Sequence, residues 1–169
     1  GGDEKYCYNN VDANCNTYGG LYQWDEAMNY ASTINCDPCG SGGRQGLCPA
    51  GFLIPTDLEW SRYEFCLEST LAPTGGTPLS TFQNNTWGRG TNSNVGPGYK
   101  MKSTGSPMNG GNGSGFTGLG AGRWNGASFS DIDKEGRFWS ATEKQGHTAW
   151  GRRLHQYDNL MLRQDEDKP

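Results

Sequence analysis

The six cysteines of this chain all lie within its first 66 residues, and this crowding constrains the fold more than any other feature. An even number of cysteines, beside few lysines and many Asn, Gly and Ser residues, is typical of a secreted module whose disulfides persist in an oxidising compartment. The sequence does not choose among the many pairings that six cysteines allow. A bond between Cys7 and Cys15 is expected from proximity alone.

Two alternatives use the same thiols. Cys36 and Cys39 stand in the motif CDPC, and with Cys48 and Cys66 they offer four sulfurs to a zinc ion, although the second pair is not a close one. The CDPC motif also has the spacing of a redox pair, which Asp37 disfavours because a neighbouring carboxylate opposes thiolate formation. Both alternatives stay open.

The composition indicates one folded, loop-rich domain. The 27 Gly and 8 Pro approach the content of disordered chains, but six Trp, eight Tyr and six Phe contradict disorder, which is poor in aromatic residues. With 33% hydrophobic residues and a mean hydropathy of -0.81, the core must be compact. The net charge of -4 offers no surface for nucleic acid, and no apolar run reaches the ~18 residues of a membrane span.

Two helices are predicted in the first half. Leu21, Trp24, Met28 and Ala31 recur at helical spacing and predict a short helix over about 24–32. Its Trp24 is expected in the core.

The second helix has the clearer signal. Thr56 and Glu59 form a capping box, which predicts a helix over about 57–69. Leu58, Phe65 and Cys66 fall on one face of it, and Trp60 is expected in the core.

The segment 70–136 is rich in Gly, Ser, Thr, Asn and Pro and is predicted to form long loops. Aromatic residues recur along it too regularly for a flexible linker, so we expect them to fix these loops onto a core. They are Phe82, Trp87, Tyr99, Phe116, Trp124 and Phe129.

Short strands are predicted after residue 136. RFWSATE is one, and a hairpin follows with its turn at Tyr157-Asp158-Asn159. This register places Leu154 opposite Leu162, His155 opposite Met161 and Arg153 opposite Arg163. Two directly opposed arginines destabilise a sheet unless an anion or carboxylate neutralises them, so the register favours an anionic partner.

Six ordered motifs then resemble a known family: CYNNVDANCNTYGGLYQWDEAM, CPAGFLIPTDLEWSRYE, GPGYKMKS, GSGFTGLGAGRWN, GRFWSATE and AWGRRLHQYDNLMLR. The chain resembles the Fibrobacter succinogenes major paralogous domain, a family of bacterial surface and secreted modules, from about Tyr6 to Arg163. The family is similar to C-type lectin-like domains. The resemblance implies an α+β fold of two helices, a small twisted antiparallel sheet and long Gly/Ser/Asn-rich loops.

The resemblance also implies one domain over 1–169 that lacks the family's usual first and last strands. The closing strand's cysteine is missing as well, which would leave one cysteine, such as Cys48, without its usual partner. An open sheet edge would permit self-association or strand addition.

Lectin-like folds mostly present ligand-binding surfaces, and the variable proteins of diversity-generating retroelements, which are similar in fold, carry hypervariable residues on their last strands. The chain departs most from its family near that region. The ligand-binding residues expected there are Lys144, Gln145, His147, Trp150, Arg153, His155, Tyr157, Asn159, Met161 and Arg163. An exposed Trp150 flanked by Arg and His would suit a protein interface or a sugar-stacking platform.

Metal and catalytic roles have weaker signals. The calcium motifs of sugar-binding C-type lectins are absent, and RWNGAS is only a faint echo of one of them. Asp131, Asp133 and Glu135 could offer hard oxygen ligands to calcium, or could simply form a solvated acidic turn. His147 and His155 have no nucleophile or carboxylate at a fixed offset. We therefore expect no cofactor, with calcium as the alternative.

The sequence thus predicts a non-enzymatic, extracellular or cell-surface module, secreted or adhesin-like, whose ligand is a protein or a glycan. The alternative is a structural subunit of a surface filament that is completed by strand addition. A remote alternative is an enzyme of the formylglycine-generating type, which shares the fold. That activity needs reactive cysteines late in the domain, and no cysteine follows Cys66.

Overall fold

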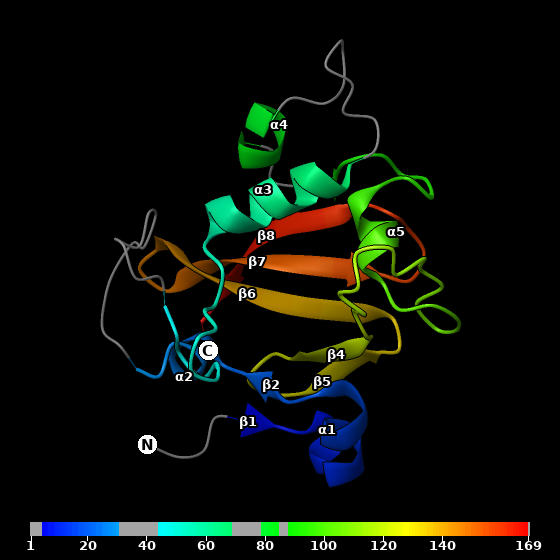
Figure 1. Cartoon of the computed structure of the whole chain (residues 1–169). Helices are drawn as coiled ribbons and strands as arrows, with labels where there is room; N and C mark the ends of the chain where they lie inside the picture. The colour runs from blue at the N-terminus through cyan, green and yellow to red at the C-terminus, as the bar shows by residue number, and fades with distance from the viewer. Residues whose placement is uncertain (1–4, 31–43, 69–78, 85–87, 169) are drawn as a thin grey trace.

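A computed structural model describes residues 5–30, 44–68, 79–84 and 88–168. The chain is α+β, with few helices and small antiparallel sheets (Figure 1). The largest sheet has the strand order β3-β8-β7-β6, formed by Gly88–Arg89, Met161–Asp167, Thr148–His155 and Glu135–Gln145. Two small sheets pair β1 (Lys5–Tyr6) with β2 (Leu21–Tyr22) and β4 (Ala121–Trp124) with β5 (Phe129–Ile132).

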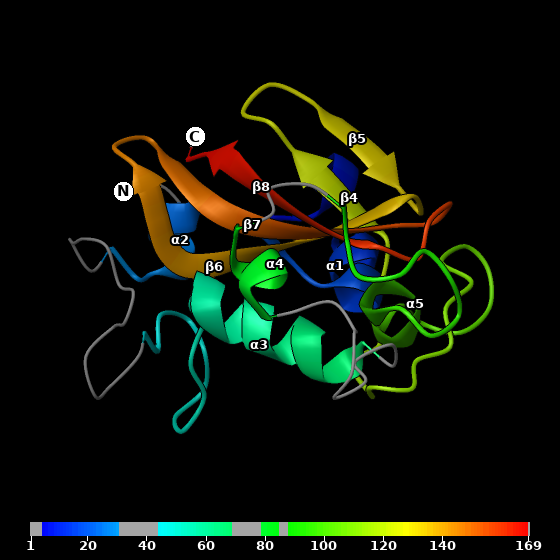
Figure 2. The same ribbon diagram turned by 90° about the horizontal axis from the view of Figure 1, so that it is seen from above.

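The four-stranded sheet separates two layers. Helices α3 (Asp57–Leu67) and α4 (Leu79–Asn84) lie on one side of it, and the β4–β5 hairpin rises on the other (Figure 2). Side chains of a strand alternate between the faces. The helix face carries Arg152, Leu154, Met161 and Arg163, and the open face carries Arg137, Trp139, Gly151, Arg153 and Glu166. None of the described helices has the length and apolarity of a membrane-spanning segment.

Helix α3 begins as its capping box predicts, because Thr56 accepts a hydrogen bond from the Glu59 amide and Glu59 accepts one from the Thr56 amide. The helix ends at Leu67, followed by Glu68 in an extended conformation. The face that carries Leu58, Phe65 and Cys66 is not the buried one, since Cys66 is exposed and the most buried residues of the helix are largely polar. They are Asp57, Trp60, Ser61 and Glu64. The reason lies on the helix face of the sheet, where arginines oppose them.

The N-terminal segment holds more helix than predicted. A 3-10 turn (Tyr8–Asn10) leads into α1 (Asp12–Tyr18), which the Cys7–Cys15 disulfide clips to the preceding turn. That bond confirms the predicted pairing. Helix α2 spans only Trp24–Ala27, because Asn29 and Tyr30 adopt left-handed φ values of 55° and 49° that end it. Residues 31–32 of the predicted helix lie outside the described part of the chain.

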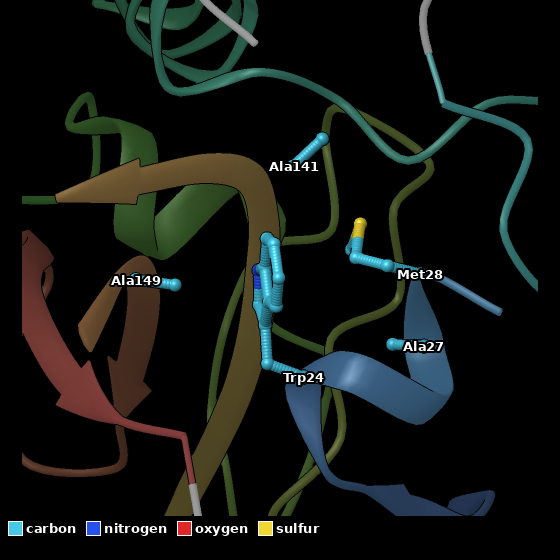
Figure 3. Close-up of a cluster of buried hydrophobic side chains, with 5 residues drawn as sticks. All are labelled: Trp24, Ala27, Met28, Ala141 and Ala149. Carbon is cyan, nitrogen blue, oxygen red and sulfur yellow. The ribbon is translucent and has the colours of Figure 1, made fainter. Parts of the chain in front are cut away.

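Most of the buried hydrophobic side chains of the described residues form two clusters. In the first, Trp24 of α2 lies against β6 beside Ala27, Met28, Ala141 and Ala149 (Figure 3). The second fills the space under α3 with Trp60, Met101, Met108, Leu154 and Met161. Trp24 is 4% exposed and Trp60 5%, which confirms both tryptophans as core residues.

The glycine-rich segment from 96 to 118 is closely packed around α5 (Pro97–Met101). A Cβ on Gly98 would come within 2.2 Å of the Leu160 carbonyl oxygen, and one on Gly110 within 2.4 Å of the Lys102 carbonyl oxygen. Backbone hydrogen bonds run from Gly111 to Tyr99 and from Gly118 to Met101. These glycines permit a close approach of backbones.

The aromatic residues of the predicted loop segment differ in burial. Phe82 is completely buried, and Tyr99, Phe116, Trp124 and Phe129 are half-buried. Trp87 lies outside the described residues.

The predicted register of the β7–β8 hairpin is wrong by one residue. Arg152 pairs with Arg163 and Arg153 with Leu162. The connection is not a three-residue turn, because β7 ends at His155 and β8 begins at Met161. Lys102 holds this longer loop from below, since its Nζ donates to the carbonyl oxygens of His155 (3.1 Å) and Asp158 (2.6 Å).

Candidate functional site

The structure divides the ten predicted ligand-binding residues among four places. Lys144, Gln145 and His147 are exposed at the tip of the β6–β7 hairpin, and Arg153 and His155 lie half-buried on the open face. Tyr157, which is 80% exposed, and Asn159 belong to the β7–β8 loop. The helix face takes Trp150, Met161 and Arg163, of which Met161 is 0% and Arg163 6% exposed. The ten residues therefore do not form one continuous surface.

Trp150 is not a free stacking platform. Its ring lies under two cations of the same chain, with the Arg163 guanidinium carbon 3.4 Å and the Lys144 Nζ 4.8 Å from its centroid. Asp165 holds Lys144 in place through a 2.8 Å ion pair. Such cation–π contacts stabilise the hairpin tip and occupy the ring that a ligand would need.

Two opposed arginines are indeed neutralised by carboxylates, and these come from the protein itself. The guanidiniums of Arg152 and Arg163 both bind Asp57, at 2.7 Å and 2.6 Å. Arg152 also donates from Nε to Glu64 at 2.5 Å, and Arg89 binds Glu64 from the other side. The predicted need for an external anion at Arg163 is thus met inside the fold.

The ionisation of this buried cluster follows from its contacts. Burial raises the pKa of Asp57, but the hydrogen bond from Arg163 and the positive charges of Arg152 and Arg163 outweigh it and leave the pKa below the ordinary value. Burial lowers the pKa of Arg89 to about 10, although Glu64 favours its charged form. Asp57 and Arg89 are therefore ionised at neutral pH, and the ion pairs of the cluster join α3 to the sheet.

The acidic turn is already hydrogen-bonded. Asp133 accepts from the Tyr18 hydroxyl at 2.6 Å, Asp131 accepts from Ser130, and Glu135 binds Arg137 at 2.9 Å. No group of three His, Cys, Asp or Glu side chains suited to a metal ion occurs in the described part of the chain.

Of the four cysteines in the zinc and redox alternatives, only Cys48 and Cys66 lie among the described residues. Cys48 and Cys66 carry no disulfide. Cys36 and Cys39 lie outside the described residues, so neither alternative is tested.

A cleft of about 550 Å³ lies where the outer edge of β6 meets the two small sheets. Aromatic side chains from separate parts of the chain line it: Tyr6, Tyr22, Trp60, Phe116, Trp124, Phe138 and Trp139. Trp124 stacks on Tyr6 with a centroid distance of 5.2 Å, and the Trp139 Nε1 donates to the Tyr22 carbonyl oxygen at 2.9 Å. These contacts hold the rings of three sheets around one space.

Gly151 leaves room on the β7 side of the cleft. A Cβ at this position would meet the Glu166 Cγ at 3.4 Å and the Phe138 carbonyl oxygen at 3.5 Å, which are ordinary contact distances. A larger side chain there would project from the open face into the cleft, so the glycine keeps that space accessible.

Charged groups accompany the rings. Arg137 donates from Nε and Nη2 to Glu135, at 3.0 Å and 2.9 Å, and from Nη1 to Glu166. Arg123 donates from Nε to the Ser130 hydroxyl at 3.0 Å, and its side chain is 40% exposed. The cleft therefore combines apolar rings with a few oriented polar groups, which is the usual composition of a small-ligand site.

Sequence reasoning missed this cleft because its lining comes from residues 6 to 167, brought together only by the tertiary fold. One local signal did exist. The RWNGAS segment places Arg123, Trp124 and Asn125 in the cleft wall, at the end of β4.

The chain was compared with protein families, curated proteins and solved structures, and only the family comparison gives a match. No curated protein and no solved structure matches the chain. The family model of the Fibrobacter succinogenes major domain matches residues 2–167, nearly the whole sequence. The chain therefore belongs to the Fibrobacter succinogenes major domain family.

Proposed function

We propose that this protein is a non-enzymatic, extracellular ligand-binding module with a C-type lectin-like fold, and that it binds a saccharide in the aromatic cleft beside β6. The observation that carries the proposal is the meeting of rings from β1, β2, β4 and β6 around a space of about 550 Å³. Of the two ligand classes expected from the sequence, the cleft favours the glycan.

The size and lining of the cleft support a small, partly polar ligand. Pockets of a few hundred Å³ that are lined by aromatic rings and a few polar groups suit ligands of roughly drug-like size. A pyranose ring offers apolar C–H faces that pack on aromatic rings, and its hydroxyls accept and donate hydrogen bonds at the edges. Arg123 and Asn125 supply donors at one end of the cleft.

The Cys7–Cys15 disulfide supports the extracellular placement, because structural disulfides persist in oxidising compartments. The adhesin role, a variable surface and the absence of catalysis stay part of the same proposal. The exposed Lys144, Gln145 and His147 and the β7–β8 loop with Tyr157 and Asn159 would contact only the parts of a larger ligand that extend beyond the cleft.

The test is to fill the cleft. Gly151→Leu places an isobutyl group on the open face, and Gly113→Leu is the matched control, since its Cβ would meet only Lys100 Cγ at 3.8 Å. Saccharides that bind the wild type on a glycan array are measured by calorimetry with both variants. We expect Gly151→Leu to lower affinity by about tenfold or more and Gly113→Leu to leave it unchanged.

Two results would contradict the proposal: an array without any binder, or equal affinity of wild type and Gly151→Leu for every binder. Size-exclusion chromatography of the same samples addresses the filament alternative. Oligomers that form without saccharide would favour assembly over ligand binding.

A further inference from the structure

The polar groups of the cleft differ in whether their hydrogen bonds are already made. Arg137 uses all three of its guanidinium nitrogens on Glu135 and Glu166. Glu166 in turn also accepts from Gln164. These groups are satisfied within the protein, so a ligand gains little by contacting them.

The end of β4 is different, because three consecutive residues there keep unused donors. Both contacts of Arg123, to Ser130 and to Asp131 at 3.6 Å, are made by Nε. Neither terminal nitrogen of its guanidinium has a partner among the described residues.

Asn125 uses its side-chain oxygen to accept from the amides of Ala127 and Ser128. Its Nδ2 has no partner in the described chain, and neither has the Trp124 indole N–H. All three residues line the cleft.

Every unused group at this end is thus a donor, and the strongest one is a guanidinium fork. A guanidinium with two free N–H groups matches the two oxygens of a carboxylate in a bidentate, charge-assisted pair. A doubly charged group such as phosphate fits less well, because a single arginine neutralises only half of its charge. The carboxylates of Asp131 and of the exposed Asp167, close to the same space, repel any anion, and they repel a doubly charged group more strongly than a singly charged carboxylate.

We infer that the ligand of the cleft is an acidic saccharide, whose carboxylate binds Arg123 while Asn125 and Trp124 donate to neighbouring oxygens. This inference rests on the proposed function and names its substrate class. Arg123 becomes the residue that sets specificity, and the aromatic rings set affinity for the sugar ring.

The experiment compares methyl hexuronides with the corresponding methyl hexosides in the gluco, galacto and manno series. Each pair differs only by a carboxylate in place of a hydroxymethyl group. Binding is followed by nitrogen–proton correlation spectra of the arginine Nε–H and tryptophan indole signals in wild type, Arg123→Gln and Gly151→Leu. Arg62→Gln is the matched control, because Arg62 is exposed on α3 and does not line the cleft.

We expect at least one hexuronide to bind about tenfold or more tightly than its neutral partner, as a charge-assisted pair implies. Arg123→Gln should abolish that ratio, because it lowers the affinity for the hexuronide far more than the affinity for the neutral hexoside. Arg62→Gln should keep the ratio, and Gly151→Leu should lower the affinity for both members of the pair.

The remaining outcomes separate the two proposals. Equal affinity for hexuronide and hexoside, or a ratio that Arg123→Gln leaves intact, would overturn the acidic ligand. If Gly151→Leu still removed that binding, the cleft would remain a saccharide site. Binding that Gly151→Leu leaves unchanged, or no shift with any glycoside, would overturn both.

Discussion

Arg152 of β7 and Arg137 of β6 lie at neighbouring positions of the four-stranded sheet but on its two opposite faces, and they differ in burial and in the carboxylates that they bind. On the helix face Arg152 is 1% exposed and binds Asp57 and Glu64 of α3. On the open face the Arg137 side chain is 17% exposed and binds carboxylates of its own sheet, Glu135 and Glu166.

The difference teaches where the charges are structural and where they are accessible. A fully buried arginine that loses its carboxylate leaves an uncompensated charge in the interior, whereas a partly exposed arginine can be hydrated instead. The helix face therefore depends on its ion pairs for folding, while the open face can exchange one partner for another.

Removing a carboxylate from the helix face should have the largest effect. Asp57→Asn keeps the shape of the side chain but removes one of the two carboxylates that bind Arg152 and the one that binds Arg163 in the described part of the chain. The free energy of unfolding, measured by urea denaturation, should fall by about 3–5 kcal/mol. Asp25→Asn is the control, because Asp25 is an exposed acidic residue in the first turn of α2 and should lose less than about 1 kcal/mol. Similar losses in both variants would remove the distinction between buried and exposed carboxylates.

Acid should reveal the same carboxylate. Because the pKa of Asp57 is lower in the folded protein than in the unfolded chain, its contribution to stability is complete above about pH 4 and is lost as the pH falls through the folded value. The urea midpoint of the wild type should therefore decrease as the pH falls below about 4. The decrease should be smaller in Asp57→Asn, and parallel profiles for the two proteins would assign the acid sensitivity to other groups.

The open face should respond less. Arg137→Gln removes the contacts to Glu135 and Glu166, but Glu135 keeps its 3.1 Å ion pair with Arg153 and the Glu166 side chain is partly exposed to water. We expect a loss of about 1–2 kcal/mol in the same urea experiment. Arg62→Gln on the outer surface of α3 should stay within about 0.5 kcal/mol of the wild type. A loss as large as that of Asp57→Asn would show that the two faces are energetically alike.

Local chemistry was predictable from the sequence. The capping box at Thr56 and Glu59 fixed the start of α3, and the short spacing of Cys7 and Cys15 indicated their bond. RFWSATE lies within β6 as expected. Each of these features depends on residues close together in the chain, where propensity and spacing carry the information.

Features that depend on distant residues were not predictable. Helix α3 buries Asp57 and Glu64 only because Arg152 and Arg163 arrive from strands about 90 or more residues later. The apolar pattern of the helix gives no sign of this. The hairpin register failed for the same reason, since Lys102 and α5 hold the β7–β8 loop in a longer connection.

In the segment 96–118 around α5, the glycines allow close packing of the backbone, not flexibility. At Gly98 and Gly110 a methyl group would collide with the main chain of a neighbouring loop, so glycine is needed where two backbone segments touch. A high glycine content usually indicates a flexible chain, but here the backbone segments lie in direct contact with one another. An alanine at either position would force these backbone segments apart, so the region does not tolerate even one added methyl group there.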